Sequence, residues 1–307
     1  MGENIKFSAD ITGEPVRLDR YLAEKYPELS RSRIQQLIAD KQILINGKNI
    51  KASFKLAGGE DVDLTLPDPE PCDIKAVDIP LDILYEDDDV LIINKPKNMV
   101  VHPSSGHTDD TLVNGILFHC HDNLSGINGI MRPGIVHRID KNTTGSLIIC
   151  KNDHAHQFLA DKLKVHDITR VYRGIVIGHL KEESGTVSLP IGRDKKDRKK
   201  MAVDHENGRE ATTHYKVLQH LNGYDECEFR LETGRTHQIR VHMASLGHPL
   251  LGDDVYGPKK CPFNLIGQTL HAEIIGFEHP TTHKNVIFQA PLPDYYKKLI
   301  DKLGGVL

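Results

Sequence analysis

Three polar stretches of the sequence carry side chains that could do chemistry together. Asp140 lies within residues 134–150, and a carboxylate on a loop between two strands can act as a nucleophile or as a base. Tyr172 could stack on a nucleobase or accept a proton. Arg240, within residues 233–243, could hold a carboxylate in its charged form. The same residue types also allow structural roles, such as an Asx turn at Asp140 or a core position for Tyr172.

The expected secondary structure brings these side chains toward one another. Residues 134–150 read as two strands, so Asp140 occupies the polar turn between them. Tyr172 falls in a further predicted strand. The alternation of polar and apolar residues at 238–241 predicts another strand, with Arg240 on its polar face. Because a buried arginine needs a partner anion, we expect a two-point contact between Arg240 and Asp140.

Metal ligands are the next chemistry to consider, because the chain contains 18 histidines and five cysteines. His154 and His156 would diverge on a helix, and His237 and His242 would point to opposite faces of a strand. There is no C-x-x-C or H-E-x-x-H pattern, and no Rossmann fingerprint or P-loop. We therefore expect neither a metal nor a cofactor.

Length and charge divide the chain into two parts. Its 307 residues suggest two domains, and no apolar run is long enough to cross a membrane. The N-terminus lacks the apolar core of a signal peptide, so we expect a cytoplasmic protein. The net charge of -4 hides a strong asymmetry. Residues 17–51 hold eight basic and four acidic side chains, whereas residues 54–89 hold twelve acids and two lysines. The proline-spaced stretch at 66–71 predicts a linker at this boundary.

The N-terminal part reads as two short helices followed by a hairpin. A helix is expected around residues 18–22, and a second one follows Ser30, a plausible N-cap. Asn46 and Gly47 supply the turn of a hairpin at 43–50. A basic helix pair of this kind suits contact with a phosphate backbone, although a solvated helix face would show the same charges.

Residues 16–22, 30–38 and 45–48 resemble an S4-like RNA-binding domain. The resemblance implies that Arg31, Arg33 and Lys41 contact RNA. The overall class is then α+β, with a small S4-like α/β domain followed by a second domain. The expected bounds are 13–66 for the S4-like domain, 67–76 for the linker and 77–303 for the catalytic domain.

The second domain resembles the RluA/RluD type of RNA pseudouridine synthase. That family's motif H-R-L-D-x-x-T-S-G appears at residues 137–145, with isoleucine for leucine and threonine for serine. The S4-like domain and His102–Pro103 resemble the RluD branch. The resemblance implies a mixed, largely antiparallel sheet flanked by helices. Further matching motifs are Asn94-Lys95-Pro96, residues 100–103, 170–172, 192–201 and 234–242.

The resemblance also implies a reaction and a role for each side chain. Uridine is isomerised to pseudouridine without a cofactor: the bond from N1 to C1′ breaks, the uracil turns, and C5 joins C1′. Asp140 is the implied catalytic carboxylate, as a nucleophile or as a base. Tyr172 would stack on the uracil and assist proton removal at C5, and Arg240 would pair with Asp140. Arg138 would fill the gap left by the flipped uridine.

The implied partner is RNA, either large-subunit (23S) ribosomal RNA or a pre-ribosomal particle, and the protein is expected to act as a monomer. The basic residues at 193–200 suggest a second RNA-contacting loop. Three alternatives stay open. They are the same chemistry on tRNA, a non-catalytic RNA-binding or ribosome-assembly factor, and a phosphotransferase. The last rests on a faint likeness of residues 140–145 to an aspartyl-phosphate loop, but Asn142 replaces the expected second acid.

Overall fold

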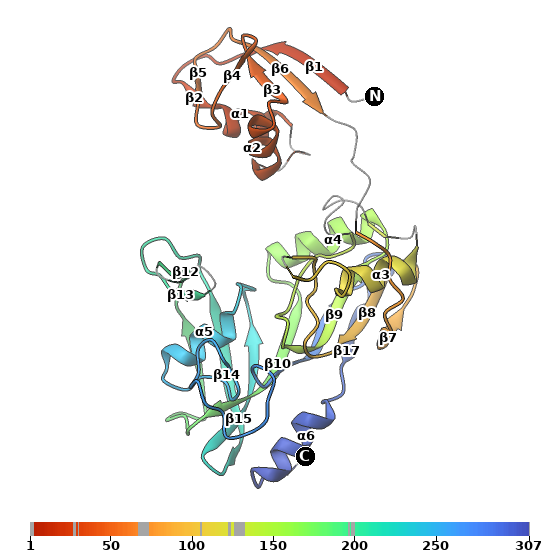
Figure 1. The fold of residues 1–307 in the computed structure, drawn as a ribbon, viewed down its shortest axis with the longest axis vertical. Coiled ribbons are helices and arrows are strands. Elements are labelled where there is room, and N and C mark those ends of the chain that lie inside the picture. Colours follow the sequence, from red (N-terminus) through yellow and green to blue (C-terminus); the bar gives the residue numbers. More distant parts are fainter. Residues whose placement is uncertain are drawn as a thin grey trace. The chain divides into compact units, whose positions relative to one another are not determined.

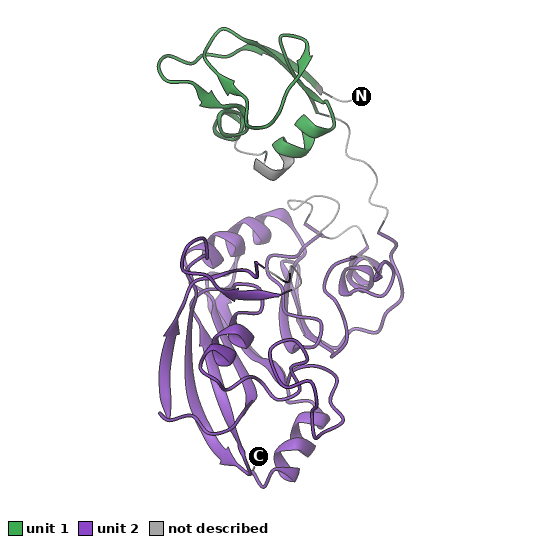
Figure 2. Cartoon of the chain, turned by 60° about the vertical axis from the view of Figure 1, so that its left-hand side comes forward, with its two compact units in different colours: residues 1–71 green, residues 72–307 purple. Residues whose placement is uncertain are grey.

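The computed structural model of the chain describes residues 3–26, 29, 31–66, 74–104, 106–121, 124–125, 133–195, 197 and 200–306, with the backbone alone at 3 and 31–33. It contains two compact units, Met1–Pro71 and Cys72–Leu307 (Figure 2). Ser30 and most of the expected linker lie outside the described residues. No described helix is long and apolar enough to cross a membrane.

The first unit packs two helices against a four-stranded antiparallel sheet (Figure 1). Asn46 and Gly47 have φ angles of 48° and 72°, which confirms the expected tight hairpin turn. Leu22, Ile34 and Leu64 are fully buried and join both helices to the sheet. The sheet order is β1 (Glu3–Ser8), β6 (Asp61–Leu66), β3 (Ile43–Ile45) and β4 (Lys48–Asn49); β2 (Val16–Arg17) pairs with β5 (Lys55–Leu56), and the helices are α1 (Leu18–Lys25) and α2 (Arg31–Ala39).

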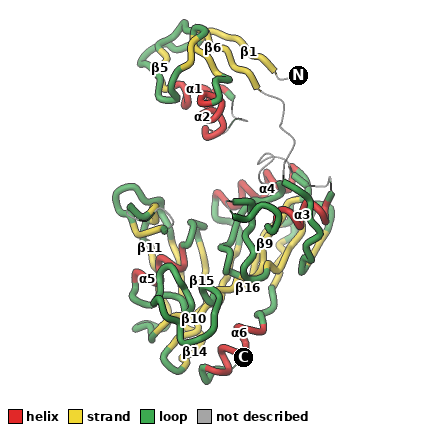
Figure 3. Tube along the Cα trace, viewed as in Figure 1, coloured by secondary structure: helices red, strands yellow, loops and turns green. Residues whose placement is uncertain are grey.

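The second unit is built on a nine-stranded mixed sheet, and strands outweigh helices in it (Figure 3). The expected mixed, largely antiparallel sheet is confirmed: among the described strands, only β9 and β16 pair in parallel. The sheet order is β11 (Ser184–Ser188), β14 (Thr212–Leu221), β15 (Tyr224–Leu231), β10 (Thr169–Ile177), β16 (Leu270–Glu278), β9 (Thr144–Cys150), β8 (Val90–Lys95) and β7 (Ile83–Glu86), with β17 (Asn285–Gln289) paired to β16; β12 (Ile191–Arg193) and β13 (Met201–Val203) form a separate hairpin.

Helices cover both faces of the sheet at β8 and β9. Along β8, Ile92 packs into a cluster with Leu159 of α4 (Asp153–Lys164). The next residue, Ile93, points the other way, into a cluster with Val113 of α3 (Leu112–Cys120). Both faces of this strand are therefore buried, which explains its unbroken apolar run. The remaining helices are α5 (Gln238–Ser245) and α6 (Asp294–Lys302).

Two expectations about local structure are wrong. The segment predicted as a strand at 238–241 is the start of helix α5. Every side chain from Gln238 to Met243 is buried, so the helix shows no amphipathic period, and its β-branched residues imitate a strand. The strand expected before Asp140 is also missing, since Ile135 makes only an isolated bridge to Ile149.

Candidate active site

Asp140 lies in a loop that enters the sheet at β9, and the loop is fixed from two sides. The backbone oxygen of Asp140 accepts a hydrogen bond of 3.0 Å from the Thr143 amide. Gln268 donates from Nε2 to Thr143 Oγ1 at 3.0 Å. On the other side, Lys95 donates from Nζ to the backbone oxygen of Lys141 at 3.0 Å. These contacts fix the backbone on both sides of the carboxylate.

Lys95 is a fully buried lysine at the end of β8. Its ammonium also donates to the backbone oxygens of Pro96 and Met99, each at 2.8 Å. Burial lowers the pKa of Lys95 to about 7, against the opposing attraction of Asp140. Three carbonyl acceptors match the three N–H groups of the charged form, so the side chain joins β8 to the Asp140 loop.

Gly145 allows the loop to join the sheet where β9 runs beside β16. Its φ is +108°, a region that side-chain-bearing residues rarely adopt. A Cβ at this position would collide with the backbone oxygen of Ala272 and lie 2.7 Å from the Ala272 nitrogen. The glycine at the end of the 137–145 motif is therefore required by the close approach of two strands.

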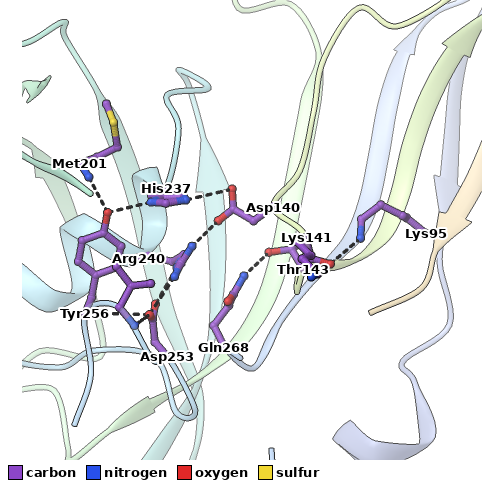
Figure 4. Close-up of polar contacts among 11 residues, drawn as sticks. Lys95, Asp140, Lys141, Thr143, Met201, His237, Arg240, Asp253, Tyr256 and Gln268 are labelled. Carbon is purple, nitrogen blue, oxygen red and sulfur yellow. Dashed lines mark hydrogen bonds and ion pairs between the residues drawn. The ribbon is translucent and has the colours of Figure 1, made fainter. Parts of the chain in front are cut away.

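Arg240 stands between two carboxylates (Figure 4). It donates from Nη1 to Asp140 Oδ2 at 3.0 Å. It donates from Nε and Nη2 to Asp253 Oδ2 and Oδ1, at 2.7 and 2.9 Å. The structure thus brings Arg240 to Asp140 as the sequence suggested, but the expected two-point contact is wrong. Asp253 takes that contact, because its side chain lies fully buried beside the guanidinium and Asp140 meets only the outer nitrogen.

The electrostatics of this contact keep Arg240 and Asp253 charged. Burial alone would lower the pKa of Arg240, but its hydrogen bonds and attraction to Asp253 and Asp140 outweigh burial and raise it above its ordinary value. Burial would likewise raise the pKa of Asp253, and Arg240 reverses that effect, so the pKa of Asp253 is lowered. Asp253 Oδ1 also accepts from the amides of Val255 and Tyr256, at 2.9 and 3.0 Å.

His237 approaches the second oxygen of Asp140, with Nε2 3.9 Å from Oδ1. Its Nδ1 lies 2.8 Å from the hydroxyl of Tyr256, and that hydroxyl accepts a 2.8 Å hydrogen bond from the Met201 amide (Figure 4). The Tyr256 hydrogen is therefore free to point at Nδ1, which leaves the imidazole proton on Nε2, facing Asp140. Burial lowers the pKa of His237, against the charge of Asp140, so the ring is neutral at neutral pH.

One cavity brings the sequence-predicted residues of this unit together, since Arg138, Asp140, Tyr172 and Arg240 all line it. Tyr172, on β10, is 8% exposed and packs in the same core cluster as Phe229. Burial raises the pKa of Tyr172, and the charge of Asp140 adds to this effect while Arg170 opposes it. The phenol is therefore protonated at neutral pH.

Arginines surround the mouth of the cavity. Arg138 is exposed and lines both this cavity and a second, neighbouring one that also includes Asp140. Arg235 also lines the first cavity, and its Nε donates to the backbone oxygen of Glu210 at 2.9 Å. The cavity holds more cationic than anionic side chains and one buried aromatic ring, which suits an anionic, aromatic ligand such as a nucleotide.

The expected RNA contacts of the first unit lie around α2. Arg31 and Arg33 are in the first turn of this helix, and their side chains lie outside the described part of the structure. Lys41 is exposed in the turn between α2 and β3, with a φ of 61°. The helix is held against α1 by Gln35, which donates to the buried Asp19 at 2.8 Å.

Several residues of the site were not assigned a role from the sequence. Lys95 and His237 lie within motifs of the sequence, whereas Asp253 lies outside them, and the sequence predicts no contact for any of the three. Tyr256 lies outside every motif of the sequence, and its position two residues after an aspartate pair is the one local signal of a role. Among the described residues, three clusters could hold a metal ion, and none of them includes Asp140.

The mixed sheet and this charged cavity define an enzyme domain suited to nucleotide chemistry, and comparison with known proteins identifies its family. Residues 89–245 match the family of RNA pseudouridylate synthases, and residues 16–62 match the S4 domain. The chain therefore belongs to the RNA pseudouridine synthases, enzymes that isomerise uridine to pseudouridine in RNA, and it carries an N-terminal S4 domain.

Relatives cover nearly the whole chain. An uncharacterised RNA pseudouridine synthase of Bacillus subtilis is 50% identical over 288 residues, which is 94% of each chain. Ribosomal large subunit pseudouridine synthase D of Escherichia coli is 40% identical over 98% of this chain and 95% of its own. That of Zymomonas mobilis is 44% identical over 94% and 93%. The solved structure of human RNA pseudouridylate synthase domain containing 1 shares the fold, with a TM-score of 0.56, 24% identity, and coverage of 77% of this chain and 98% of that one.

Proposed function

We propose that this protein isomerises specific uridines of large-subunit ribosomal RNA, in the cytoplasm and as a monomer, with Asp140 as its catalytic group. The RNA is proposed from the names of the relatives at 40–44% identity. The observation that supports the role of Asp140 is its position: an ion-paired carboxylate lies on the wall of a cavity that also holds Tyr172 and Arg138.

Asp140 reacts with the flipped uridine through the oxygen that Arg240 leaves uncovered. Arg240 holds Oδ2, whereas Oδ1 accepts no hydrogen bond from the described residues and lies 3.9 Å from Nε2 of His237. The bond from C1′ to N1 breaks and the bond from C1′ to C5 forms, while C5 loses a proton and N1 gains one. Attack by the carboxylate and removal of a sugar proton both require the anion that Arg240 stabilises.

Tyr172 and Arg138 hold the nucleotide rather than transfer protons. The buried phenol of Tyr172 is protonated at neutral pH, which favours stacking on the uracil over a role as a base. Arg138 is exposed at the cavity mouth and can enter the stack when the uridine leaves it, an extrusion that costs a few kcal/mol. Arg31, Arg33 and Lys41 of the S4 domain bind the RNA backbone.

The test of this function is the loss of one carboxylate. Asp140→Ala should abolish tritium release from RNA labelled at C5 of uridine, while filter binding of the same RNA survives. Asp301→Ala, at an exposed position of α6, is the matched control and should stay active. Full activity of Asp140→Ala would contradict the assignment of the catalytic group.

The substrate is tested by mapping pseudouridines in a strain that lacks the gene. Sites missing from 23S ribosomal RNA and restored by the wild-type gene, but not by Asp140→Ala, would support the proposal. Sites missing only from tRNA would assign the chemistry to the other substrate. Restoration of a growth or assembly defect by Asp140→Ala would point to a non-catalytic assembly role.

A further inference from the structure

Two histidines and a buried aspartate meet at the end of the sheet opposite to the active site. Asp225 lies near the start of β15, His220 is its partner on β14, and His179 follows the end of β10. From Tyr172 to the end of β10 at Ile177 the strand runs roughly 17 Å, and His179 lies two residues beyond that end. We propose that His179, His220 and Asp225 bind a divalent transition-metal ion, of which Zn²⁺ is the expected one. This site does not depend on the proposed function.

The buried carboxylate sets the geometry. Asp225 is fully buried, and its Oδ1 lies 2.7 Å from Nδ1 of His179 and 2.7 Å from Nδ1 of His220. Its Oδ2 accepts a 2.7 Å hydrogen bond from the Leu180 amide, so the carboxylate cannot turn away. The ligand atoms of the three side chains lie within 4.8 Å of one another. Three donors of the kinds that bind zinc therefore converge from three segments of the fold.

The proton positions leave room for a cation. With no metal bound, Nδ1 of each ring must carry a proton to donate to Asp225. His220 Nε2 lies 3.0 Å from Glu183 Oε1, so both nitrogens of this ring face a carboxylate oxygen. A metal ion on the two Nδ1 atoms replaces these protons, and each neutral ring keeps one on Nε2. Glu183 is then already placed to accept a hydrogen bond from Nε2 of His220, as carboxylates commonly do from metal-bound imidazole.

The site must open slightly to accept the ion. Tetrahedral zinc with bonds of about 2.0–2.2 Å separates its ligand atoms by roughly 3.3–3.5 Å. Each ring must therefore move out from Asp225 by about 0.6–0.8 Å. The side chains of His179 and His220 are 50% and 52% exposed, so solvent gives them this freedom. Two imidazoles and one carboxylate favour Zn²⁺, Co²⁺ or Ni²⁺ over Mg²⁺ and Ca²⁺, and leave a coordination position open to solvent.

Neither of the other two clusters offers an equal set of ligands. His279 accepts at Nδ1 from the amides of Thr281 and Thr282, so its Nε2 keeps a proton, which it donates to Asp87 at 2.8 Å. That ring has no lone pair for a metal. The remaining cluster consists of Glu86, His119 and Cys120. Burial raises the pKa of the Cys120 thiol to about 11, so the thiolate that would bind a metal is disfavoured.

The experiment uses the full chain after treatment with a chelator and its removal. Zn²⁺ is titrated by calorimetry into the wild type, into His179→Ala/His220→Ala, and into His154→Ala/His205→Ala, which removes two exposed histidines elsewhere. We expect the wild type and the control pair to bind one Zn²⁺ that the first pair binds at least ten-fold more weakly. Co²⁺ should give the visible d–d absorption of a tetrahedral site in the wild type and in the control pair, but not in His179→Ala/His220→Ala. Glu183→Gln, at an exposed position, should weaken binding by up to about ten-fold.

Uridine isomerisation by each variant reports whether it is folded, because none of these residues lines the active-site cavity. Equal binding of Zn²⁺ by the wild type and by His179→Ala/His220→Ala would overturn the proposal. So would the absence of a Co²⁺ band in the wild type. If the double variant is inactive, Glu183→Gln and the Co²⁺ spectrum of the wild type still decide the matter, since neither requires that variant to fold.

Discussion

Replacement of Asp253 by asparagine tests whether the buried triad holds the site together. Asp253 is fully buried and makes the two-point contact with Arg240, which is itself 4% exposed. Asp253→Asn keeps the shape of the side chain but removes the charge. Removal of one partner from a buried ion pair costs about 3–5 kcal/mol, because it leaves the other charge without compensation. Since Asp140 still pairs with Arg240, we expect the lower half of this range.

The loss should be visible in unfolding experiments. For a unit of this size each kcal/mol shifts the Tm by roughly 2–4 °C, so Asp253→Asn should unfold about 6–16 °C below the wild type. Urea titration gives the free energy directly. Asp254→Asn is the matched control, because the Asp254 carboxylate is the exposed neighbour of Asp253. Loss of the Asp254 charge should change the free energy of unfolding by less than about 0.5 kcal/mol.

The pH dependence gives an independent check. Arg240 lowers the folded-state pKa of Asp253 despite burial, so it lies below the unfolded value of about 3.9. The stability from this carboxylate is therefore fully present above that value and is lost as pH falls through the folded pKa. The gap between wild type and Asp253→Asn should be equal at pH 7 and pH 5 and should shrink below about pH 4. A gap under about 1 kcal/mol at pH 7, or one that does not narrow in acid, would refute this reasoning.

Two further predictions follow from the contacts of the site and of the S4 domain. Tyr256→Phe removes the hydroxyl that joins the Met201 amide to His237, so kcat should fall while KM for RNA is unchanged. His237→Gln should reproduce this effect. Normal turnover in both variants would disprove the link between these contacts and activity. Arg31→Ala with Arg33→Ala should weaken RNA binding and reduce the slope of log K against log salt by about 1.4–1.8, as measured by filter binding. An unchanged slope would remove these two arginines from the RNA contact.

The sequence predicts best where a residue's function depends on local spacing. The tight turn at Asn46 and Gly47 can be recognised from a short pattern, and the structure has it as expected. The place of Asp140 in a loop at the sheet also follows from its motif. These features require only a few neighbouring residues, so a single sequence contains the necessary information.

The sequence fails where burial or long-range contacts decide the structure. Helix α5 is buried on all sides, and without an exposed face its residues carry no helical period. The contact between Asp253 and Arg240 depends on the position of the segment just before Asp253. That segment is fixed beside β10, because the Leu251 amide donates a hydrogen bond to the backbone oxygen of Ile175. The cluster of His179, His220 and Asp225 likewise joins three segments that only the sheet register brings together.

The two aspartates that contact Arg240 have different contacts with it, and this explains why one arginine is buried between two carboxylates. A two-point contact between Arg240 and Asp140 would occupy both carboxylate oxygens and leave none for the catalytic role that we propose for Asp140. Asp253 instead takes the two-point contact and fixes the guanidinium, and the ring of Tyr256 lies 5.1 Å from its central carbon. Asp140 receives one hydrogen bond from Arg240, at Oδ2, which orients the carboxylate and leaves Oδ1 without a hydrogen bond from the described residues.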